Sequence, residues 1–425
     1  MRMKSYFCKM ESVIELLNKC KKAARKINAA TDAQLNEVLL KIANLLNEKR
    51  NEIIAANTID VTKLEESNPR KDRLLLTDSR IDELITGLKE VAALPSPTGI
   101  LLKSSVMENG LLIEKYAVPL GVVGVIYESR PNVTVDVAAL CLKSGNAVVL
   151  RGGTEADNSN KILVALAREA LLQLDLPEDA VTLLPPDRQY VTTMLEAEKL
   201  IDVIIPRGSQ ELIDFVRKES RIPVIETGAG VCHTYVSKNA QLQMAAAIVI
   251  NAKTSRPSVC NALDTILVDK AICKDFLEMI QEKFAAFHVQ VHADEFSFPI
   301  LEKNNYPFLQ HADASDFGKE YLDFACSVKV VNDLDEALEH IQQYSSKHSE
   351  AIVTELSTEA KRFLQEVDAA AVYHNASTRF TDGGCFGLGA EIGISTQKLH
   401  ARGPFALEKL VTEKWVVTGN GQVRN

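Results

Sequence analysis

The sequence predicts an α/β protein made of two doubly wound units and a small additional β segment. From Val118 onward, short runs of apolar and β-branched residues alternate with helical segments, and a second alternating series begins after Val236. Strands that are apolar on both faces and are joined by helices form parallel sheets that are covered on both sides. The two series therefore indicate two such sheets.

The chain up to Pro95 is expected to be helical. Thr31 to Gln34 has the form of a capping box, which begins a helix. Apolar residues then recur at helical spacing in two segments, so each segment has an apolar face that must pack on another element. The two faces are formed by Leu35, Val38, Leu39, Ile42 and Leu46, and by Ile81, Leu84, Ile85, Leu88 and Val91.

The first sheet is expected to follow Val118. Its predicted strands are Gly121–Tyr127, Ala147–Leu150, Val181–Leu184, Ile201–Ile205 and Ile222–Ile225. Its predicted helices are Val133–Leu142, Ile162–Leu172 and Glu211–Val216. Each helix lies between two strands, as the crossover connections of a parallel sheet require.

The second sheet is expected after Val236 and begins with a helix at Leu242–Ala252. Its predicted strands are Ala262–Val268, Val289–Val291, Val328–Val331, Ala351–Val353 and Ala370–Tyr373. The other predicted helices are a segment that ends at Phe284, Leu334–Ile341 and Thr358–Val367. A glycine-rich connection at Thr381–Arg402 and a short helix at Phe405–Leu410 follow.

Two strand-like segments, Leu111–Val118 and Trp415–Thr418, have no partner in these two sheets. Exposed strand edges favour association with other chains, and oligomerisation is one way to cover them. Pairing of the segments within one chain would cover them as well. The sequence alone does not decide between these arrangements.

Charge and hydropathy exclude several classes of protein. The 48 Lys+Arg and 57 Asp+Glu give a net charge of −9, whereas general binding of nucleic acid or of anionic membranes needs a basic surface. The longest apolar stretch, Ala117–Tyr127, is shorter than the ~20 residues of a spanning helix, and the first residues lack the apolar core of a secretory signal. We therefore expect a cytoplasmic protein with no nucleic-acid or membrane partner.

The eight cysteines include no C-x-x-C pair. In a chain of this length they are too sparse for a disulfide framework and wrongly spaced for structural zinc. We expect free thiols and no metal.

The common phosphate-binding motifs are absent from the sequence. No G-x-x-x-x-G-K-[S/T] occurs, which excludes P-loop kinases and NTPases. Gly228-Ala-Gly230 follows a predicted strand but leads into another strand-like run at His233 rather than into a helix. Any dinucleotide must therefore bind without the usual glycine motif.

Cys260 is a candidate nucleophile because of its surroundings. It falls on a short turn between a helix and a strand, close in sequence to Lys253 and Arg256. Nearby cations and exposed backbone N–H groups favour a thiolate. Most cysteines are inert packing residues, however. The positions of Cys326 and Cys385 do not exclude these two as nucleophiles either, so the residues alone do not decide which cysteine reacts.

Polar residues follow several strands of the first sheet. Ligand sites in open α/β sheets gather at the carboxyl ends of the strands, and a helix N-terminus with a glycine suits a phosphate. Each of these ends alone could be an ordinary turn, but together they indicate a binding edge. The residues are Asn132, Arg151, Arg207, Gly208, Ser209 and Glu226.

The glycine-rich segments near the C-terminus are too polar for a core. Arg379, His400 and Arg402 lie in them among several glycines. Such a set can surround a phosphate or a carboxylate. A solvated surface loop is the alternative.

Several segments of the sequence together resemble the γ-glutamyl phosphate reductase family of the aldehyde dehydrogenase superfamily. The resemblance extends over nearly the whole chain from Glu11. The last three of the segments given next distinguish this family from general aldehyde dehydrogenases. The segments are PLGVVGVIYESRPNVT (119–134), VVLRGG (148–153), VIIPRGS (203–209), VIETGAGVCH (224–233), NAKTSRPSVCN (251–261), NASTRFTDGG (375–384) and GAEIGISTQKLHARGP (389–404).

The resemblance implies an aldehyde dehydrogenase-like fold with a cofactor domain, a catalytic domain and a small β oligomerisation flap. We expect the cofactor domain at residues 1–107 and 121–236, with residues 365–405 returning to it. The catalytic domain is expected at residues 237–364, and the flap at residues 108–120 and 406–425. Members of the superfamily bind a dinucleotide on a doubly wound sheet without the common glycine motif.

The activity implied by the resemblance is NADPH-dependent reduction of L-glutamyl 5-phosphate through a cysteine thioester. The products are L-glutamate 5-semialdehyde and phosphate, in the second step of proline synthesis from glutamate. The expected partners are further copies of the chain and a glutamate kinase that supplies the substrate, with channelling as one mode of delivery.

The resemblance also implies roles for individual residues. Cys260 matches the nucleophile, and Asn132 matches the amide that forms the oxyanion hole with the Cys260 N–H. Gly208 and Ser209 match the turn at the cofactor pyrophosphate, and Glu320 matches the residue that bonds the nicotinamide ribose.

Specificity and substrate binding involve further candidates. Arg151 stands where many relatives have a lysine that contacts the adenosine ribose, and together with Thr154 it favours NADPH over NADH, although Glu155 is adjacent. Glu226 is expected to be structural or to face the cofactor. The candidates for holding the two charged ends of the substrate are Lys253, Arg379, His400 and Arg402.

Other functions remain open at this point. A hydrolytic aldehyde dehydrogenase would oxidise a small semialdehyde without phosphate. A cysteine hydrolase would use Cys260 with His233 as its base and would need no nicotinamide. A catalytically inactive scaffold is disfavoured by the presence of Cys260 and Asn132.

Overall fold

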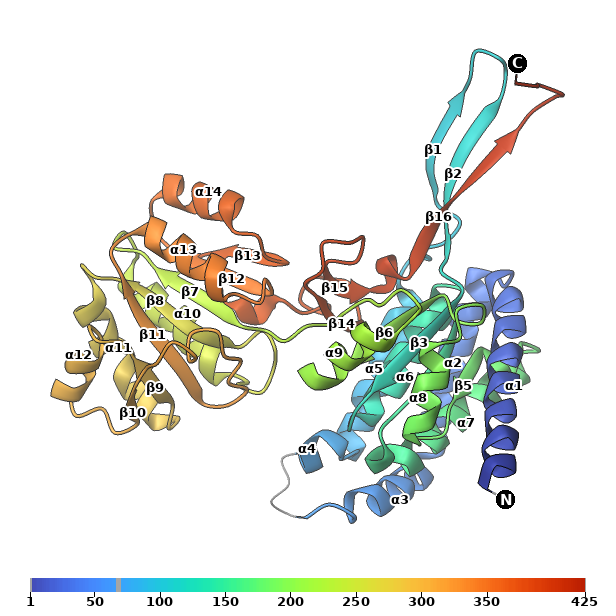
Figure 1. Cartoon of the computed structure of the whole chain (residues 1–425), viewed down its shortest axis with the longest axis horizontal. Coiled ribbons are helices and arrows are strands. Elements are labelled where there is room, and N and C mark those ends of the chain that lie inside the picture. Colours follow the sequence, from blue (N-terminus) through green and yellow to red (C-terminus); the bar gives the residue numbers. More distant parts are fainter. Residues whose placement is uncertain (1, 66–69, 425) are drawn as a thin grey trace. The chain divides into compact units, whose positions relative to one another are not determined.

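The computed structural model describes residues 2–65 and 70–424 (Figure 1). The chain forms two compact units. Unit 1 runs to Thr227 and includes Gly387–Gly393 and the chain from Pro404 onward, whereas unit 2 comprises Gly228–Phe386 and Ile394–Gly403. Each unit is described by itself.

Unit 1 begins with helices, as predicted. Thr31 and Gln34 form a reciprocal capping box at the start of α2, and Thr77 caps α5. The predicted apolar faces of these helices are buried, with Ile85 half-buried. The helices are α1 (Arg2–Asn28), α2 (Asp32–Glu48), α3 (Arg50–Val61), α4 (Arg70–Leu74) and α5 (Asp78–Ala93).

The sheet of unit 1 is parallel, with the strand order β5-β4-β3-β6. Its strands are β3 (Val122–Tyr127), β4 (Ala147–Arg151), β5 (Val181–Leu183) and β6 (Val203–Arg207). The helices that connect or follow them are α6 (Pro131–Lys143), α7 (Asp157–Gln173), α8 (Arg188–Leu195) and α9 (Gln210–Glu219). Helix α8 was not predicted from the sequence.

The strand predicted at Ile222–Ile225 does not form. This segment makes only an isolated bridge between Val224 and Ile204 of β6. Pro206 in β6 has no N–H with which to continue the ladder, and its carbonyl accepts from the side chain of Thr227 (2.8 Å). The prediction was wrong because the edge of β6 cannot bond a further full strand.

Unit 2 contains a seven-stranded sheet with the order β10-β9-β11-β8-β7-β12-β13. All of its described pairs are parallel. The strands are β7 (Cys232–Val236), β8 (Leu263–Asp269), β9 (Gln290–Ala293), β10 (Leu309–His311), β11 (Ala325–Val331), β12 (Ser349–Val353) and β13 (Ala371–His374). The helices are α10 (Leu242–Thr254), α11 (Cys273–Ala286), α12 (Phe298–Lys303), α13 (Leu334–Tyr344) and α14 (Ser357–Glu366).

Both faces of this sheet are buried. Tyr235 and Leu267 pack against α13 and α14, whereas Val236 and Ile266 belong to the core formed with α10 and α11. Neighbouring residues of a strand point to opposite faces, so two helix layers cover the two faces. The doubly wound α/β prediction is confirmed for this unit.

The boundary between the units differs from the predicted one. We placed residues up to Val236 and residues 365–405 with the first sheet, but β7 pairs with β8 and β12, and β13 pairs with β12. Both strands therefore belong to unit 2. Of the predicted return, only Gly387–Gly393 and the chain from Pro404 belong to unit 1.

A separate antiparallel sheet contains the two strands that lacked partners. Its order is β1-β2-β16, with β1 (Leu101–Val106), β2 (Leu112–Pro119) and β16 (Val411–Thr418). The two predicted strands thus pair within the chain, and β1 was missed. Side chains at Val106, Trp415 and Val417 remain 73%, 53% and 56% exposed.

The short helix predicted at Phe405–Leu410 is also a correction. The chain instead forms β15 (Gly403–Ala406), which pairs with β14 (Glu391–Ser395), and then a single 3-10 turn at Leu407–Lys409. A helix of this length is marginal by itself, so strand pairing determines the structure.

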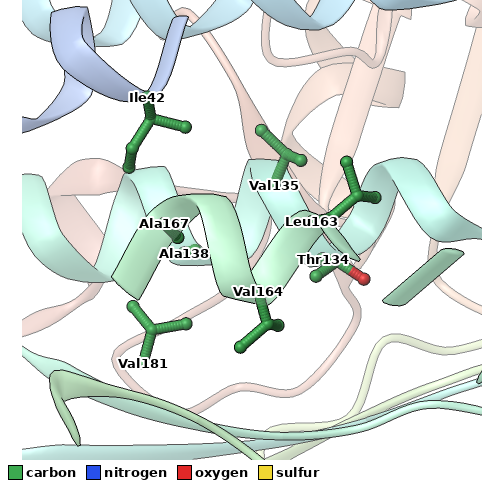
Figure 2. A pocket seen from close by; sticks show the side chains of 8 residues that line it. All are labelled: Ile42, Thr134, Val135, Ala138, Leu163, Val164, Ala167 and Val181. Atoms are coloured by element: carbon green, nitrogen blue, oxygen red, sulfur yellow. The ribbon is translucent and has the colours of Figure 1, made fainter. Parts of the chain in front are cut away.

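A small apolar cavity lies within unit 1 (Figure 2). Its volume is about 10 Å³, roughly the room of one water molecule. Its one oxygen-bearing side chain, Thr134, already bonds Tyr127 and Asn160 (2.7 and 2.9 Å). This cavity is therefore a packing void rather than a ligand site. The residues that line it come from α2, α6, α7 and β5 and are Ile42, Thr134, Val135, Ala138, Leu163, Val164, Ala167 and Val181.

The described part of the chain contains no helix that is both long and apolar enough to cross a membrane. The described cysteines, which do not include Cys8, are free thiols.

A buried lysine joins three helices of unit 1. Lys143, at the end of α6, is fully buried, and its ammonium lies 2.7 Å from Asp32 Oδ1 and 2.5 Å from Asn36 Oδ1 on α2. It also donates to the carbonyl of Ala92 on α5 (3.4 Å). Since Asp32 is 41% exposed, its carboxylate can regain water when the lysine is removed.

We predict that Lys143→Ala lowers the free energy of unfolding by ~2–4 kcal/mol, because it removes these bonds and leaves a cavity. Lys143→Met keeps most of the side-chain volume and should lose less, ~1–2 kcal/mol. Urea denaturation followed by circular dichroism measures both values. Equal losses for the two variants would mean that the packing of the stem is unimportant here.

Candidate active site

The Cys260 turn lies at the amino edge of the seven-stranded sheet. In a parallel sheet all strands begin at the same edge, and the register places Cys232 beside Leu263 and His233 beside Glu350. Cys260 lies between α10 and β8, just before this edge, and is half-buried.

The backbone of Cys260 is closely packed. A methyl group on Gly230 would lie only 1.6 Å from the Cys260 carbonyl oxygen, so only glycine fits there. The Cys232 thiol donates to the same carbonyl (Sγ to O, 3.3 Å), and burial raises the pKa of Cys232 well above its usual value, which keeps it protonated. The Gly230 N–H donates to Glu320 Oε1 (2.7 Å).

The next residue, Asn261, is held through its side-chain amide and its backbone carbonyl. Its amide nitrogen donates to the carbonyls of Arg379 (3.3 Å) and Thr381 (2.8 Å). Its own carbonyl accepts from Thr378 Oγ1 (2.8 Å), and its side-chain oxygen accepts from the Arg379 guanidinium. The segment after β13 therefore fixes the turn that carries the candidate nucleophile.

Lys253 is not available to a substrate in this structure, contrary to our prediction. It is fully buried and its ammonium donates to the carbonyl of Asp323 (3.1 Å), 3.9 Å from Asp264 Oδ1. Burial raises the pKa of Asp264 to about 7, although Lys253 and two backbone N–H groups lower it. Lys253 thus belongs to the support beneath the turn.

His233 does not fit the role of a base for Cys260. It is fully buried, and its Nδ1 lies 3.0 Å from Glu350 Oε2. Its ring packs edge to face on that of His340 in α13, with 5.5 Å between the ring centroids. Beside His233, burial lowers the pKa of His340 to about 3. This arrangement disfavours the hydrolase function.

The remaining candidates for substrate binding have different surroundings. His400 is exposed. Arg402 Nη1 lies 2.7 Å from Asp368, and hydrogen bonds from Lys398 and Arg402 hold the pKa of Asp368 well below its usual range. Arg379 is half-buried and bonds Asn261 and Ser255.

In unit 1 the predicted residues gather at the carboxyl ends of the parallel strands. Asn132 lies in the first turn of α6, after β3, and its side chain is exposed. Arg151 ends β4 and donates to the carbonyl of Pro186 after β5 (2.5 Å). Arg207 ends β6. Asn132 lies in unit 1, and Cys260 lies in unit 2.

At this edge, two backbone N–H groups already donate to acidic side chains. Ser209 caps α9, and its N–H donates to Glu128 Oε2 (3.0 Å), so a carboxylate stands at the helix N-terminus that we predicted for a phosphate. A methyl on Gly208 would lie 2.6 Å from the same oxygen. Glu155 is turned toward Ser129, whose N–H donates to its Oε1 (2.7 Å).

The residues present fit an anionic dinucleotide. Among the described side chains, Arg151 Nε is buried without a hydrogen-bond partner, and burial lowers the Arg151 pKa. Arg188, which the sequence analysis missed, begins α8 after β5 and acts electrostatically on Arg151. Arg188 follows a predicted strand of the first sheet, and this position could have identified it as a candidate binding residue.

Asp136 supports Asn132 from the next turn of α6. The Asn132 amide donates to Asp136 Oδ2 (3.2 Å). Burial raises the pKa of Asp136 to about 6, while the bond from Asn132 and the charge of Arg207 act in the opposite direction. Between the ordinary carboxyl pKa and this value the folded protein binds the proton more tightly than the unfolded chain, so this group's contribution to stability falls as pH rises.

We predict that Asp136→Asn is more stable than the wild type by ~1–2 kcal/mol at neutral pH, since it removes a desolvated charge. The advantage should shrink as pH falls through about 6 and vanish near pH 4, where the wild-type carboxyl is protonated. Thermal unfolding of both proteins over this pH range measures the difference. A constant difference would show that Asp136 does not titrate in this window.

Comparison with known proteins gives consistent matches. Residues 3–313 match the model of the aldehyde dehydrogenase family. The chain is 49% identical to gamma-glutamyl phosphate reductase of Chlorobium luteolum over 415 residues, 97% of this chain and 99% of that protein. It is 50% identical to the reductase of the same name from Halothermothrix orenii over 419 residues, again 97% and 99%.

Solved structures agree with these matches. A crystal structure of gamma-glutamyl phosphate reductase from Thermotoga maritima has a TM-score of 0.92 at 46% identity and covers 97% of this chain and 100% of that one. An acetylating aldehyde dehydrogenase from Geobacillus thermoglucosidasius, 16% identical with a TM-score of 0.70, shares the fold and covers 99% of each chain. The aldehyde dehydrogenase-like fold expected from the sequence is confirmed.

Proposed function

The chain belongs to the gamma-glutamyl phosphate reductases of the aldehyde dehydrogenase family, and from this premise we propose that it reduces L-glutamyl 5-phosphate with NADPH. The products are L-glutamate 5-semialdehyde and phosphate, in the proline branch of glutamate metabolism. The single observation that carries the proposal is the geometry of the Cys260 turn. Gly230 and Thr378 hold the backbone of the turn, whereas Cys260 itself is only half-buried.

Cys260 forms the covalent intermediate. Its thiolate attacks the acyl carbon of the mixed anhydride, the bond to the phosphate oxygen breaks, and a thioester remains while phosphate leaves. After reduction, collapse to the aldehyde returns the thiol. The close contact of Gly230 with the Cys260 carbonyl supports this role, because it limits how far the attacking group can move.

Asn132 and the Cys260 N–H stabilise the developing oxyanion. Both carbonyl additions place negative charge on the same oxygen, and a fixed donor to it is usually worth ~2.7–4 kcal/mol. The exposed position of Asn132, held by Asp136 at 3.2 Å, supports this assignment.

The cofactor, when bound, supplies the hydride. Arg151 and Thr154 would face its adenosine end, with Arg188 adding a second cation for a 2′-phosphate. The engagement of Glu155 with Ser129 draws that carboxylate to an internal partner and so favours NADPH. Gly208 and Ser209 would hold the pyrophosphate, and Glu320 the nicotinamide ribose.

The proposed reaction includes no deacylation by water, so it needs no carboxylate base to activate a water molecule. Phosphate leaves unaided, and Glu226 lies 3.6 Å from Arg217 on α9, which agrees with a structural role. This distinguishes the proposed reaction from that of a hydrolytic aldehyde dehydrogenase.

The roles of the parts follow from the same proposal. Unit 1 binds the cofactor, unit 2 carries the nucleophile, and the β1-β2-β16 sheet joins copies of the chain into an oligomer. The exposed apolar side chains of that sheet support the last role. The protein would act in the cytoplasm and receive its substrate from a glutamate kinase.

We predict that Cys260→Ser lowers turnover at least ~10³-fold, because a serine hydroxyl is a far weaker nucleophile at neutral pH. Absorbance of the reduced cofactor, followed with semialdehyde, NADP⁺ and phosphate, measures the reverse reaction. The wild type should need phosphate. Oxidation without phosphate would identify a hydrolytic dehydrogenase instead.

We predict that Asn132→Ala lowers kcat by ~10²–10³-fold while NADPH binding changes little, since the lost donor acts on the oxyanion. Kinetics and a fluorescence titration of NADPH measure the two quantities. Equal losses in both would show that Asn132 binds the cofactor and not the oxyanion.

A further inference from the structure

Arg379 connects the two ends of the Cys260 turn. Its guanidinium bonds the side-chain oxygen of Asn261, the residue after Cys260, and its Nε donates to Ser255 Oγ at the end of α10 (3.2 Å). Its backbone carbonyl accepts from the Asn261 amide as well (3.3 Å). One side chain therefore spans the turn from the end of the helix to the residue beside the nucleophile.

The same contacts place a permanent positive charge beside Asn261, the residue that follows Cys260. An arginine stays protonated at all physiological pH values. Burial lowers the pKa of Arg379, as does the charge of Arg256, whereas Asp382 and Cys260 raise it. The charge of a Cys260 thiolate and that of the guanidinium thus attract one another.

We propose that Arg379 is a positioning residue for Cys260 and not a ligand of the substrate. Its fork holds the turn in one conformation, and its charge favours the thiolate form of the nucleophile. This inference rests on the proposed function only in taking Cys260 as the nucleophile. It replaces the expectation that Arg379 binds one charged end of the substrate.

Other titratable groups face the same turn, and their charges act on Cys260 together with that of Arg379. Cys232, whose pKa lies well above its usual value, is neutral and donates to the Cys260 carbonyl. The other charged or titratable groups near the turn include Arg256 on the turn itself and the buried Lys253 beneath it. Asp382 and Cys385 lie on the Arg379 segment, and Asp264, Glu320 and Glu350 lie at the strand edge.

Alkylation kinetics test the proposal without using catalysis. The rate of Cys260 modification by iodoacetamide, read peptide by peptide with mass spectrometry between pH 5 and 10, gives the pH at which the thiolate forms. Glutathione alkylated in the same reaction is the reference for the reagent, because Cys385, although exposed, interacts electrostatically with Arg379. The variants are Arg379→Gln, Arg379→Lys and, as a control for net charge, Arg362→Gln on α14, where the arginine pairs with Asp335 and Glu366.

In Arg379→Gln the midpoint for Cys260 should rise by about one pH unit, which slows modification near neutral pH ~10-fold. Arg379→Lys keeps the charge and should keep the midpoint, but it loses the fork, so its kcat falls while the KM for the substrate changes little. Arg362→Gln should match the wild type in both measurements.

An unchanged Cys260 midpoint in Arg379→Gln would overturn the proposal, as would an equal shift in Arg362→Gln. A rise in KM alone would restore Arg379 as a substrate ligand. If the Gln variant does not fold, as judged by circular dichroism, the kcat and KM of Arg379→Lys decide between the two roles. Failure of the proposed function looks different, because Cys260→Ser would then remain active whatever the alkylation profile.

Discussion

The parallel register of the unit 2 sheet is the constraint on which the candidate site depends. Because β7, β8 and β12 begin at one edge, Gly230, Cys232 and the Cys260 turn are forced together there. The contact between Gly230 and the Cys260 carbonyl leaves no room for a side chain. The short turn that carries the candidate nucleophile is thereby held as firmly as the sheet itself.

Buried carboxylates stabilise this edge by bonding backbone amides rather than solvent. Asp264 accepts from the N–H groups of Cys232 (3.3 Å) and Tyr321 (3.0 Å), and Glu350 accepts from that of His233 (2.8 Å). Each bond joins neighbouring segments at the start of their strands. The edge is therefore held by directional polar bonds, while the middle of the sheet is held by apolar packing on both faces.

The sequence predicted what depends on local pattern and missed what depends on distant partners. Strands such as β3 and β4 were found because both faces are buried and their residues are almost all apolar. The strand at Ile222–Ile225 failed because Pro206, elsewhere in the sequence, ends the ladder. The internal roles of Arg379 and Lys253 could not be foreseen, since Arg379 bonds Asn261, 118 positions away, and Lys253 bonds Asp323, 70 positions away.

Glu128 at the N-terminus of α9 has a consequence for ligand chemistry in unit 1. A phosphate that accepts from the Ser209 amide has to take the place of a carboxylate already seated there. Binding at that point is an exchange of one anion for another, and its affinity reflects only the difference between them. The Glu128 carboxylate thus neutralises this helix end in the absence of a ligand, and only a group that is more strongly anionic than a carboxylate gains by displacing it.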